Sequence, residues 1–164
     1  MLTAALELLL AEGAAVLTPQ RLHLATGVSR STVYRHWPTP HAVLEALIAV
    51  APDHAPMHSG DLGDDLHAEV DHLCNRLRDK PVAPFLQALV AASAADLRHR
   101  YVEDLMAPFQ SALRGVGTKA DRDDAVAVIV SPLLLDALLL DRPTARTRAH
   151  RTVDLVVGRF EGVR

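Results

Sequence analysis

Apolar residues recur at three- and four-residue spacing along nearly the whole chain, which is the spacing of one helix face. No sustained alternation of apolar and polar residues and no glycine–asparagine hairpin signal is present, so we expect no β-sheet. Hydroxyl-then-proline pairs start helices, and glycines end them. The expected helices cover about residues 2–12, 18–26, 29–37, 39–50, 61–79, 84–94, 96–114, 121–140 and 144–160. The pattern therefore predicts an all-α protein.

Residues 51–60 interrupt this pattern with a stretch rich in proline, histidine, serine and glycine. Such a composition is typical of a loop and marks a candidate domain boundary. We therefore expect an N-terminal head at residues 1–48 and a second helical domain at residues 49–164.

Charge is distributed unevenly between these two regions. The formal net charge of −3 and the sequence pI of about 6.3 argue against a nucleic-acid binder, because such domains are usually basic. From Gly13 to Leu44, however, the chain has no Asp or Glu, while it has Arg21, Arg30 and Arg35. The sequence thus predicts a positive face on the head of an otherwise acidic protein.

The same stretch has the pattern of a helix-turn-helix, which makes the head a three-helix DNA-binding domain. Two short expected helices are joined at residues 26–29, where Gly27 permits a left-handed turn and a steep crossing angle. Val33 and Trp37 are four residues apart, so they lie on one face and can anchor the second helix. The side chains of the other faces then point outward.

This outward set suits double-stranded DNA. Arg30 can bind a guanine with two hydrogen bonds, and the hydroxyls of Ser31 and Thr32 can reach bases or phosphates. The side chains of Tyr34, Arg35 and His36 can bind phosphate oxygens, and the free N–H groups near Thr18 add a phosphate site.

The segment GVSRSTVYRHWPTPHAVLEAL, residues 27–47, resembles the recognition half of the TetR family of bacterial repressors. The resemblance is strong over residues 2–48. Residues from about Val82 onward, including Ser131-Pro132-Leu133, are similar to one C-terminal type of the family. The residues that match the family turn and recognition helix in order are Gly27, Val28, Ser29, Thr32, Val33, Tyr34 and Trp37.

The resemblance implies a set of DNA contacts for this chain. The implied base or near-base contacts are Gln20, Arg30, Ser31 and Thr32, the implied phosphate contacts are Thr18, Tyr34 and His36, and Arg35 fits either role. Three features depart from the family pattern: Pro40 replaces a phosphate-binding lysine, His23 replaces a small residue, and no basic arm precedes the first helix. We therefore expect either modest DNA affinity or a true N-terminal start that lies before Met1.

The most apolar stretch predicts a dimer. Thirteen of the 16 residues from Ala125 to Leu140 are apolar, so this helix needs cover on nearly all sides. A second subunit supplies such cover, and the resemblance also implies dimerisation through the last two helices. The alternative is a central helix in a monomeric bundle. The expected interface residues are Val126, Ile129, Val130, Leu133, Leu134, Val153, Val156, Val157 and Phe160.

The resemblance further implies a small-molecule effector, bound by the middle helices. Few charges lie on their apolar faces, so the effector should be mainly apolar, and it would release DNA by favouring a state whose heads are wrongly spaced. The alternative is that these faces are ordinary core. The candidate ligand-binding residues are Leu66, Val70, Leu73, Leu89, Tyr101, Leu105 and Phe109.

The remaining chemistry-bearing residues predict no catalytic, metal or cofactor site. His54, His58, His67 and His72 lie in one segment but lack the spacing of a metal site, and no catalytic motif is present. The single cysteine, Cys74, and the lack of a secretory signal favour a cytoplasmic protein that does not enter the membrane. The sequence predicts a homodimeric DNA-binding repressor; the alternative is a helical homodimeric protein-interaction module that has lost DNA binding.

Overall fold

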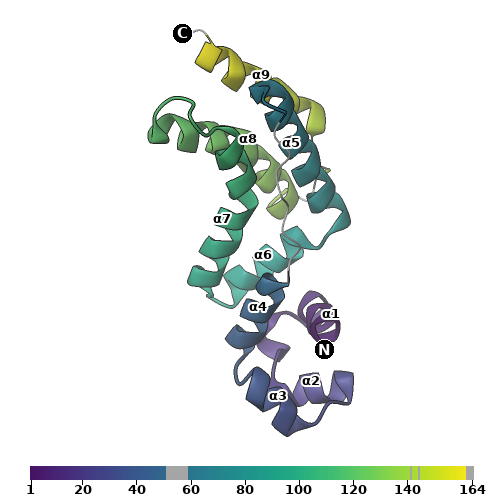
Figure 1. Ribbon diagram of the computed structural model, residues 1–164. Coiled ribbons are helices and arrows are strands. Elements are labelled where there is room, and N and C mark those ends of the chain that lie inside the picture. The colour runs from purple at the N-terminus through teal and green to yellow at the C-terminus, as the bar shows by residue number, and fades with distance from the viewer. Residues whose placement is uncertain (51–58, 141, 144, 162–164) are drawn as a thin grey trace. The chain divides into compact units, whose positions relative to one another are not determined.

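The computed structural model describes residues 1–50, 59–140, 142–143 and 145–161, and the regular structure of these residues is entirely helical. This confirms the all-α prediction. The helices, shown in Figure 1, are α1 (Leu2–Glu12), the short 3₁₀ helix η1 (Ala14–Val16), α2 (Pro19–Thr26), α3 (Arg30–His36), α4 (Pro40–Ala49), α5 (Leu62–Asp79), α6 (Val82–Ala91), α7 (Ala95–Ala112), α8 (Lys119–Leu138) and α9 (Arg146–Glu161).

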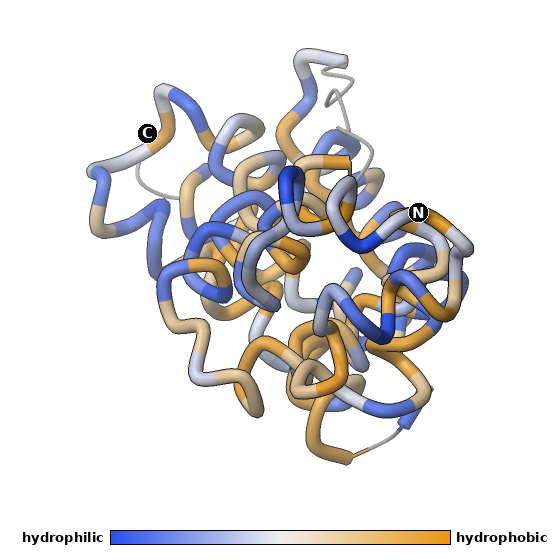
Figure 2. The backbone as a smooth tube through the Cα atoms, turned by 90° about the horizontal axis from the view of Figure 1, so that it is seen from below, coloured by the Kyte–Doolittle hydropathy of each residue, from blue (hydrophilic) through white to orange (hydrophobic). Residues whose placement is uncertain are grey.

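Side-chain caps fix where several of these helices begin. The hydroxyls of Thr18, Ser29 and Thr39 accept hydrogen bonds from the backbone N–H three residues later, at 3.3, 3.3 and 3.2 Å. The carboxylate of Asp61 accepts the corresponding bond from Asp64 at 2.9 Å. Each cap satisfies a backbone donor that has no partner inside the helix. Hydrophobic and hydrophilic stretches alternate along the backbone, as Figure 2 shows.

The described residues form two compact units. One unit contains α1 to α4, α6 from Pro84 and α7 up to Tyr101; the other contains α5, the rest of α7, α8 and α9. The expected boundary between residues 48 and 49 stays a prediction, and most of the expected loop at residues 51–60 lies outside the described residues.

The first unit is built around α1 to α4. Helix α1 packs against α2 and α4, and α2 packs against α3. Leu17, Leu22, Val33 and Leu44 are all at most 1% exposed, so α1 to α4 enclose an apolar core. This core gives α3 a rigid support.

Helix α4 also connects to α7 within the same unit. The Arg100 guanidinium lies 3.1 Å from the Glu45 carboxylate, and the His41 ring lies 3.4 Å from the carboxylate of Asp96. These exposed ion pairs add little stability. Both ion pairs nevertheless join side chains of α4 to side chains in the first half of α7.

The second unit is held together by α5, α8 and α9, which contact one another. Leu66, Ile129 and Val153, one from each helix, are buried between them. The His150 ring lies 2.8 Å from the Asp71 carboxylate, and the His67 ring lies 2.9 Å from the carboxylate of Asp154. Apolar packing and paired polar contacts therefore both join α5 to α9.

Two prolines, Pro84 and Pro108, lie within helices and do not end them. The helix expected to begin at Pro84 begins two residues earlier, at Val82, because the first turn of a helix needs no N–H donors. Pro108 lies inside α7, and the helix continues through it to Ala112. The buried neighbours Leu105 and Phe109 supply packing that offsets the lost backbone bond.

Helix α6 ends with a strained serine, which leads to a stability prediction. Ser93 has a φ of 53°, and the bonds Ser93 N–H to Val90 O and Ala94 N–H to Leu89 O form a Schellman cap. Because glycine adopts this left-handed backbone without steric cost, Ser93→Gly should stabilise the fold by about 1 kcal/mol. Ala91→Gly, inside the same helix, should destabilise it by a similar amount. Urea unfolding measures both, and equal losses would contradict the strain argument.

The start of α8 predicts a pH effect. Hydrogen bonds from the Thr118 hydroxyl, at 2.7 Å, and then from its backbone N–H, at 3.0 Å, hold the pKa of Asp121 below its ordinary value. A carboxyl whose pKa is lowered on folding stabilises the protein above its unfolded pKa, and this contribution is lost as pH falls through the folded value. Asp121→Asn should therefore destabilise the protein at neutral pH and lose its effect in acid.

Urea unfolding at neutral pH and at about pH 3 measures this change, since an unperturbed aspartate titrates near 4. Asp124→Asn, an exposed carboxylate in the same helix, is the control and should have little effect at either pH. Thr118→Ala should cost about 1 kcal/mol through loss of the cap. An Asp121→Asn effect that is equal at both pH values would contradict the assignment.

No helix in the described part of the chain is both long enough and apolar enough to cross a membrane.

Candidate nucleic-acid interface

The helices α2 and α3 meet at a tight turn, residues 26–29. Gly27 has φ 69° and ψ −1°, which is the left-handed conformation expected from the sequence, and its N–H donates to the His23 carbonyl at 2.8 Å. An L side chain is disfavoured in this conformation, so glycine allows α3 to leave at a steep angle. The two helices pack against each other and form a helix-turn-helix.

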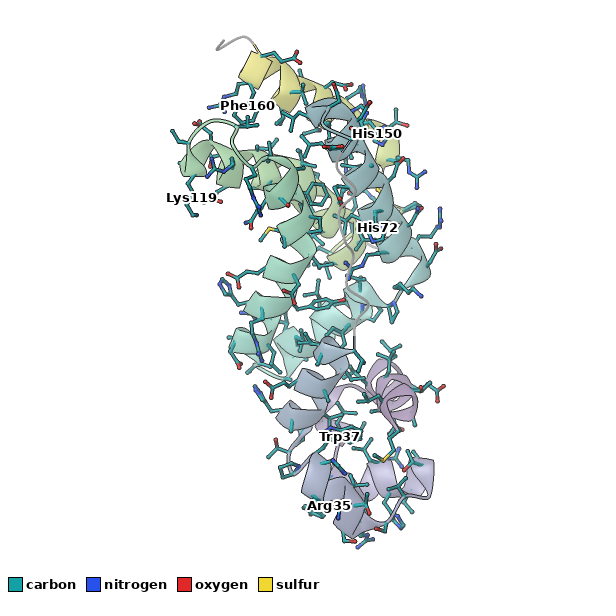
Figure 3. The ribbon with its side chains drawn as sticks, viewed as in Figure 1. Arg35, Trp37, His72, Lys119, His150 and Phe160 are labelled. Carbon is teal, nitrogen blue, oxygen red and sulfur yellow. The ribbon has the colours of Figure 1, made fainter. Side chains whose placement is uncertain are left out.

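One face of α3 anchors it to the head. Val33 is fully buried, and Leu22 from α2 is 1% exposed. Trp37 follows the last residue of α3, is half-buried, and lies on the side towards α4 in Figure 3. The side chains on the other faces of α3 are therefore left available for a partner.

The outer faces of α3 contain the residues expected to contact DNA. Arg30, Ser31, Tyr34, Arg35 and His36 are all exposed, and Tyr34 retains 57% of its surface. Arg35 is labelled on α3 in Figure 3. These five side chains therefore point away from the core.

The other three expected DNA contacts lie at the helix starts. Gln20 is exposed in α2, while Thr18 and Thr32 are half-buried. The Thr18 hydroxyl accepts from the Arg21 N–H, and the Thr32 hydroxyl lies 2.9 Å from that of Ser29. The Thr18 hydroxyl thus caps α2, and the Thr32 hydroxyl contacts the hydroxyl that caps α3.

The electrostatics favour an anionic partner. In the part of the chain that the structure describes, neither Arg30 nor Arg35 forms an ion pair with a carboxylate. Arg21 differs, because its guanidinium pairs with Glu12 at the end of α1. The sequence analysis missed this pair, although Glu12 is the last acid before the acid-free stretch. Two unpaired arginines on one exposed short helix form a positive surface of the kind that binds phosphates.

The expected ligand-binding residues are all buried, and they are divided between the two units. Leu66, Val70 and Leu73 lie on α5, and Leu105 and Phe109 on the part of α7 that belongs to the same unit. Their role as effector contacts stays a prediction.

The two remaining candidates, Leu89 on α6 and Tyr101 on α7, lie in the other unit. Tyr101 packs edge-on against Phe85, with ring centroids 5.1 Å apart. The sequence analysis did not anticipate that the carboxylates of Asp65 and Glu69 are also buried, on α5.

The expected dimer residues mostly belong to the core of their own subunit. A side chain without exposed surface has none to give a partner, so an interface must use other residues. The four that keep partial exposure are Leu134, Val156, Val157 and Phe160. The five that are at most 1% exposed are Val126, Ile129, Val130, Leu133 and Val153.

Phe160, labelled in Figure 3, lies against the turn before α8: a Cβ atom placed on Gly117 would be 3.0 Å from its ring. This aromatic residue thus covers part of its own subunit.

The histidines do not gather into a metal centre in the described residues. No group of three or more His, Cys, Asp or Glu side chains is placed there to hold a metal ion. His67 contacts Asp154 and stacks on His150 with ring centroids 4.6 Å apart, and His54 and His58 lie outside the described residues.

Comparison with known proteins relates this geometry to a family. Residues 1–47 match the model described as bacterial regulatory proteins, tetR family. A crystal structure of a TetR transcriptional regulator from Agrobacterium tumefaciens has a similar fold, with a TM-score of 0.62 and 21% sequence identity over 97% of this chain and 91% of that one. No curated protein matches the chain.

Proposed function

We propose that the chain is a non-enzymatic DNA-binding transcriptional regulator of the TetR family, whose family model matches its N-terminal helix-turn-helix domain. It acts as a homodimeric repressor of a palindromic operator. The observation that supports this most is the exposed face of α3, where Arg30, Ser31, Tyr34 and Arg35 surround a buried Val33 anchor. Bound to the bacterial chromosome, the protein acts in the cytoplasm.

We assign the expected roles to these side chains. Arg30, at the start of α3, enters the major groove and binds a guanine edge, because the first residues of a recognition helix come closest to the bases. Tyr34, His36 and Thr18 bind phosphates and set the register, and Arg35 binds either a phosphate or a base. Gln20, Ser31 and Thr32 complete the contacts near the bases.

The dimer interface lies on the outer face of α8 and α9, which contact each other. Ile129 and Leu133 face the core, while Val128 and Leu135 on the same helix are 54% and 47% exposed. Leu139, the C-cap residue of this helix, is 76% exposed. On α9, Leu155 is 77% exposed. Isolated apolar side chains are common on surfaces, but an apolar row on two neighbouring helices is typical of an interaction surface.

A second copy of the chain is the partner that this face fits best. Ser131 on α8 and Gly158 on α9 are exposed next to the apolar row, and their small size lets two helices approach closely. A two-fold pairing of one face with itself gives two identical heads, as a palindromic operator requires.

The effector is a small, mainly apolar molecule that contacts the candidate residues of the unit that contains α5 and the later part of α7, which are Leu66, Val70, Leu73, Leu105 and Phe109. Binding of the effector favours a conformation whose two heads do not fit the operator. The change in the free-energy difference between the two conformations is set by the difference in effector affinity between them. Titration of apolar compounds into an operator complex tests this proposal, which fails if none releases the DNA.

Selection from a library of random duplexes tests the function itself. The full-length protein should enrich a palindrome whose half-sites lie about one helical turn, or a multiple of it, apart. Binding to the selected duplex should fall steeply with salt, because phosphate contacts release counterions. If no sequence is enriched while the protein remains a folded dimer, the alternative of an interaction module without DNA binding is correct.

A further inference from the structure

His23, in the last turn of α2, differs from the other residues of the helix-turn-helix because its side chain contacts the turn itself. Its ring nitrogen Nδ1 lies 2.7 Å from the backbone carbonyl oxygen of Val28, and the contact is partly buried. A small residue is expected at this position from the resemblance to the family, and a small residue cannot reach that carbonyl.

The chemistry of this contact fixes where the proton is. A carbonyl oxygen only accepts hydrogen bonds, so Nδ1 must carry a proton and donate it. In neutral histidine the contact therefore selects the form with hydrogen on Nδ1, and protonated histidine keeps the same donor.

A second side chain of α2 holds the other end of Val28. The Thr26 hydroxyl donates to the Leu22 carbonyl at 2.6 Å and accepts from the Val28 N–H at 3.3 Å. Both backbone groups of Val28 are thus bonded to side chains from the last turn of α2. The next residue, Ser29, is the N-cap of α3.

We propose that His23 is a positioning residue for DNA recognition, which fixes the start and direction of α3 through its bond to the Val28 carbonyl. The proposal depends on the proposed DNA-binding function. Because a small misplacement of a rigid recognition element weakens directional base contacts more than phosphate contacts, the bond supports specific binding above non-specific binding.

Two substitutions separate the hydrogen bond from simple packing. His23→Ala removes the donor, whereas His23→Asn keeps an N–H donor the same number of bonds from Cα as Nδ1. We expect His23→Ala to weaken binding to the selected operator about tenfold and His23→Asn to stay within about threefold of the wild type. Binding of both variants to an unrelated duplex should match the wild type.

A nitrogen-15 NMR spectrum of the imidazole in the free full-length protein tests the bond without DNA. It should show the proton on Nδ1 at neutral pH, and a spectrum with the proton on Nε2 alone would overturn the proposal. Operator binding by His23→Ala equal to the wild type, or an equal loss in His23→Asn, would also overturn it. Failure of the wild type to bind any selected duplex would instead contradict the proposed function, while the NMR result still reports on the bond.

Discussion

Leu155→Glu is expected to convert the dimer into monomers and to weaken operator binding about 100-fold. Leu155 is 77% exposed on α9, and in the proposed dimer a second subunit covers it. A carboxylate at this place would face apolar side chains of the partner without a counter-charge, and burying an unpaired charge is costly. Loss of the second head then removes the gain from binding two half-sites at once.

Sedimentation analysis measures the change in oligomeric state, and fluorescence anisotropy measures operator affinity. Val90→Glu is the matched control, because Val90 is also exposed, at 57%, but lies on α6 outside the apolar row of α8 and α9. It should remain dimeric. A second interface variant, Leu139→Glu, should repeat the effect of Leu155→Glu. If both interface variants sediment as dimers, the dimer interface does not lie on this face of α8 and α9.

Arg30→Ala is expected to weaken operator binding by about 1–3 kcal/mol and to relax the preference at one base position in each half-site. Arg30 is exposed at the first position of α3 and has no carboxylate partner among the described residues, so its removal leaves the fold unchanged. A phosphate contact would behave differently: its loss would weaken binding to all sequences equally and reduce the salt dependence.

Selection of duplexes by the Arg30→Ala variant and fluorescence anisotropy of its operator binding distinguish a base contact from a phosphate contact. The control is Arg114→Ala, which removes an exposed arginine from the other unit and so changes the net charge by the same amount. It should bind like the wild type. Uniform weakening by Arg30→Ala would assign Arg30 to a phosphate, and wild-type binding would remove it from the interface.

Much of the fold could be predicted because local signals agree with the tertiary structure. Thr18 and Thr39 precede prolines, and Gly27 ends α2 in the left-handed conformation that its type suggested. The outward position of Tyr34 and Arg35 followed from the spacing of Val33 and Trp37. In short capped helices the apolar spacing alone therefore indicates which face is free.

The exposed face of α8 and the His23 hydrogen bond could not be predicted from local spacing in the sequence. Helix α8 is apolar on nearly all sides, so its periodicity could not distinguish Ile129, which faces the core, from Val128, which faces outward. The choice depends on how α5 and α9 pack against it. The His23 bond also could not be predicted, because its acceptor is a backbone carbonyl five residues away.

The central claim is that α3 is the surface that contacts DNA, and NMR titration of the labelled dimer with its selected duplex tests it most directly. The account predicts that the largest amide shifts lie at Arg30, Ser31, Tyr34 and Arg35, while the buried Val33 methyl groups shift little. Large shifts on other helices with α3 unchanged, or an equal response to any duplex sequence, would contradict it.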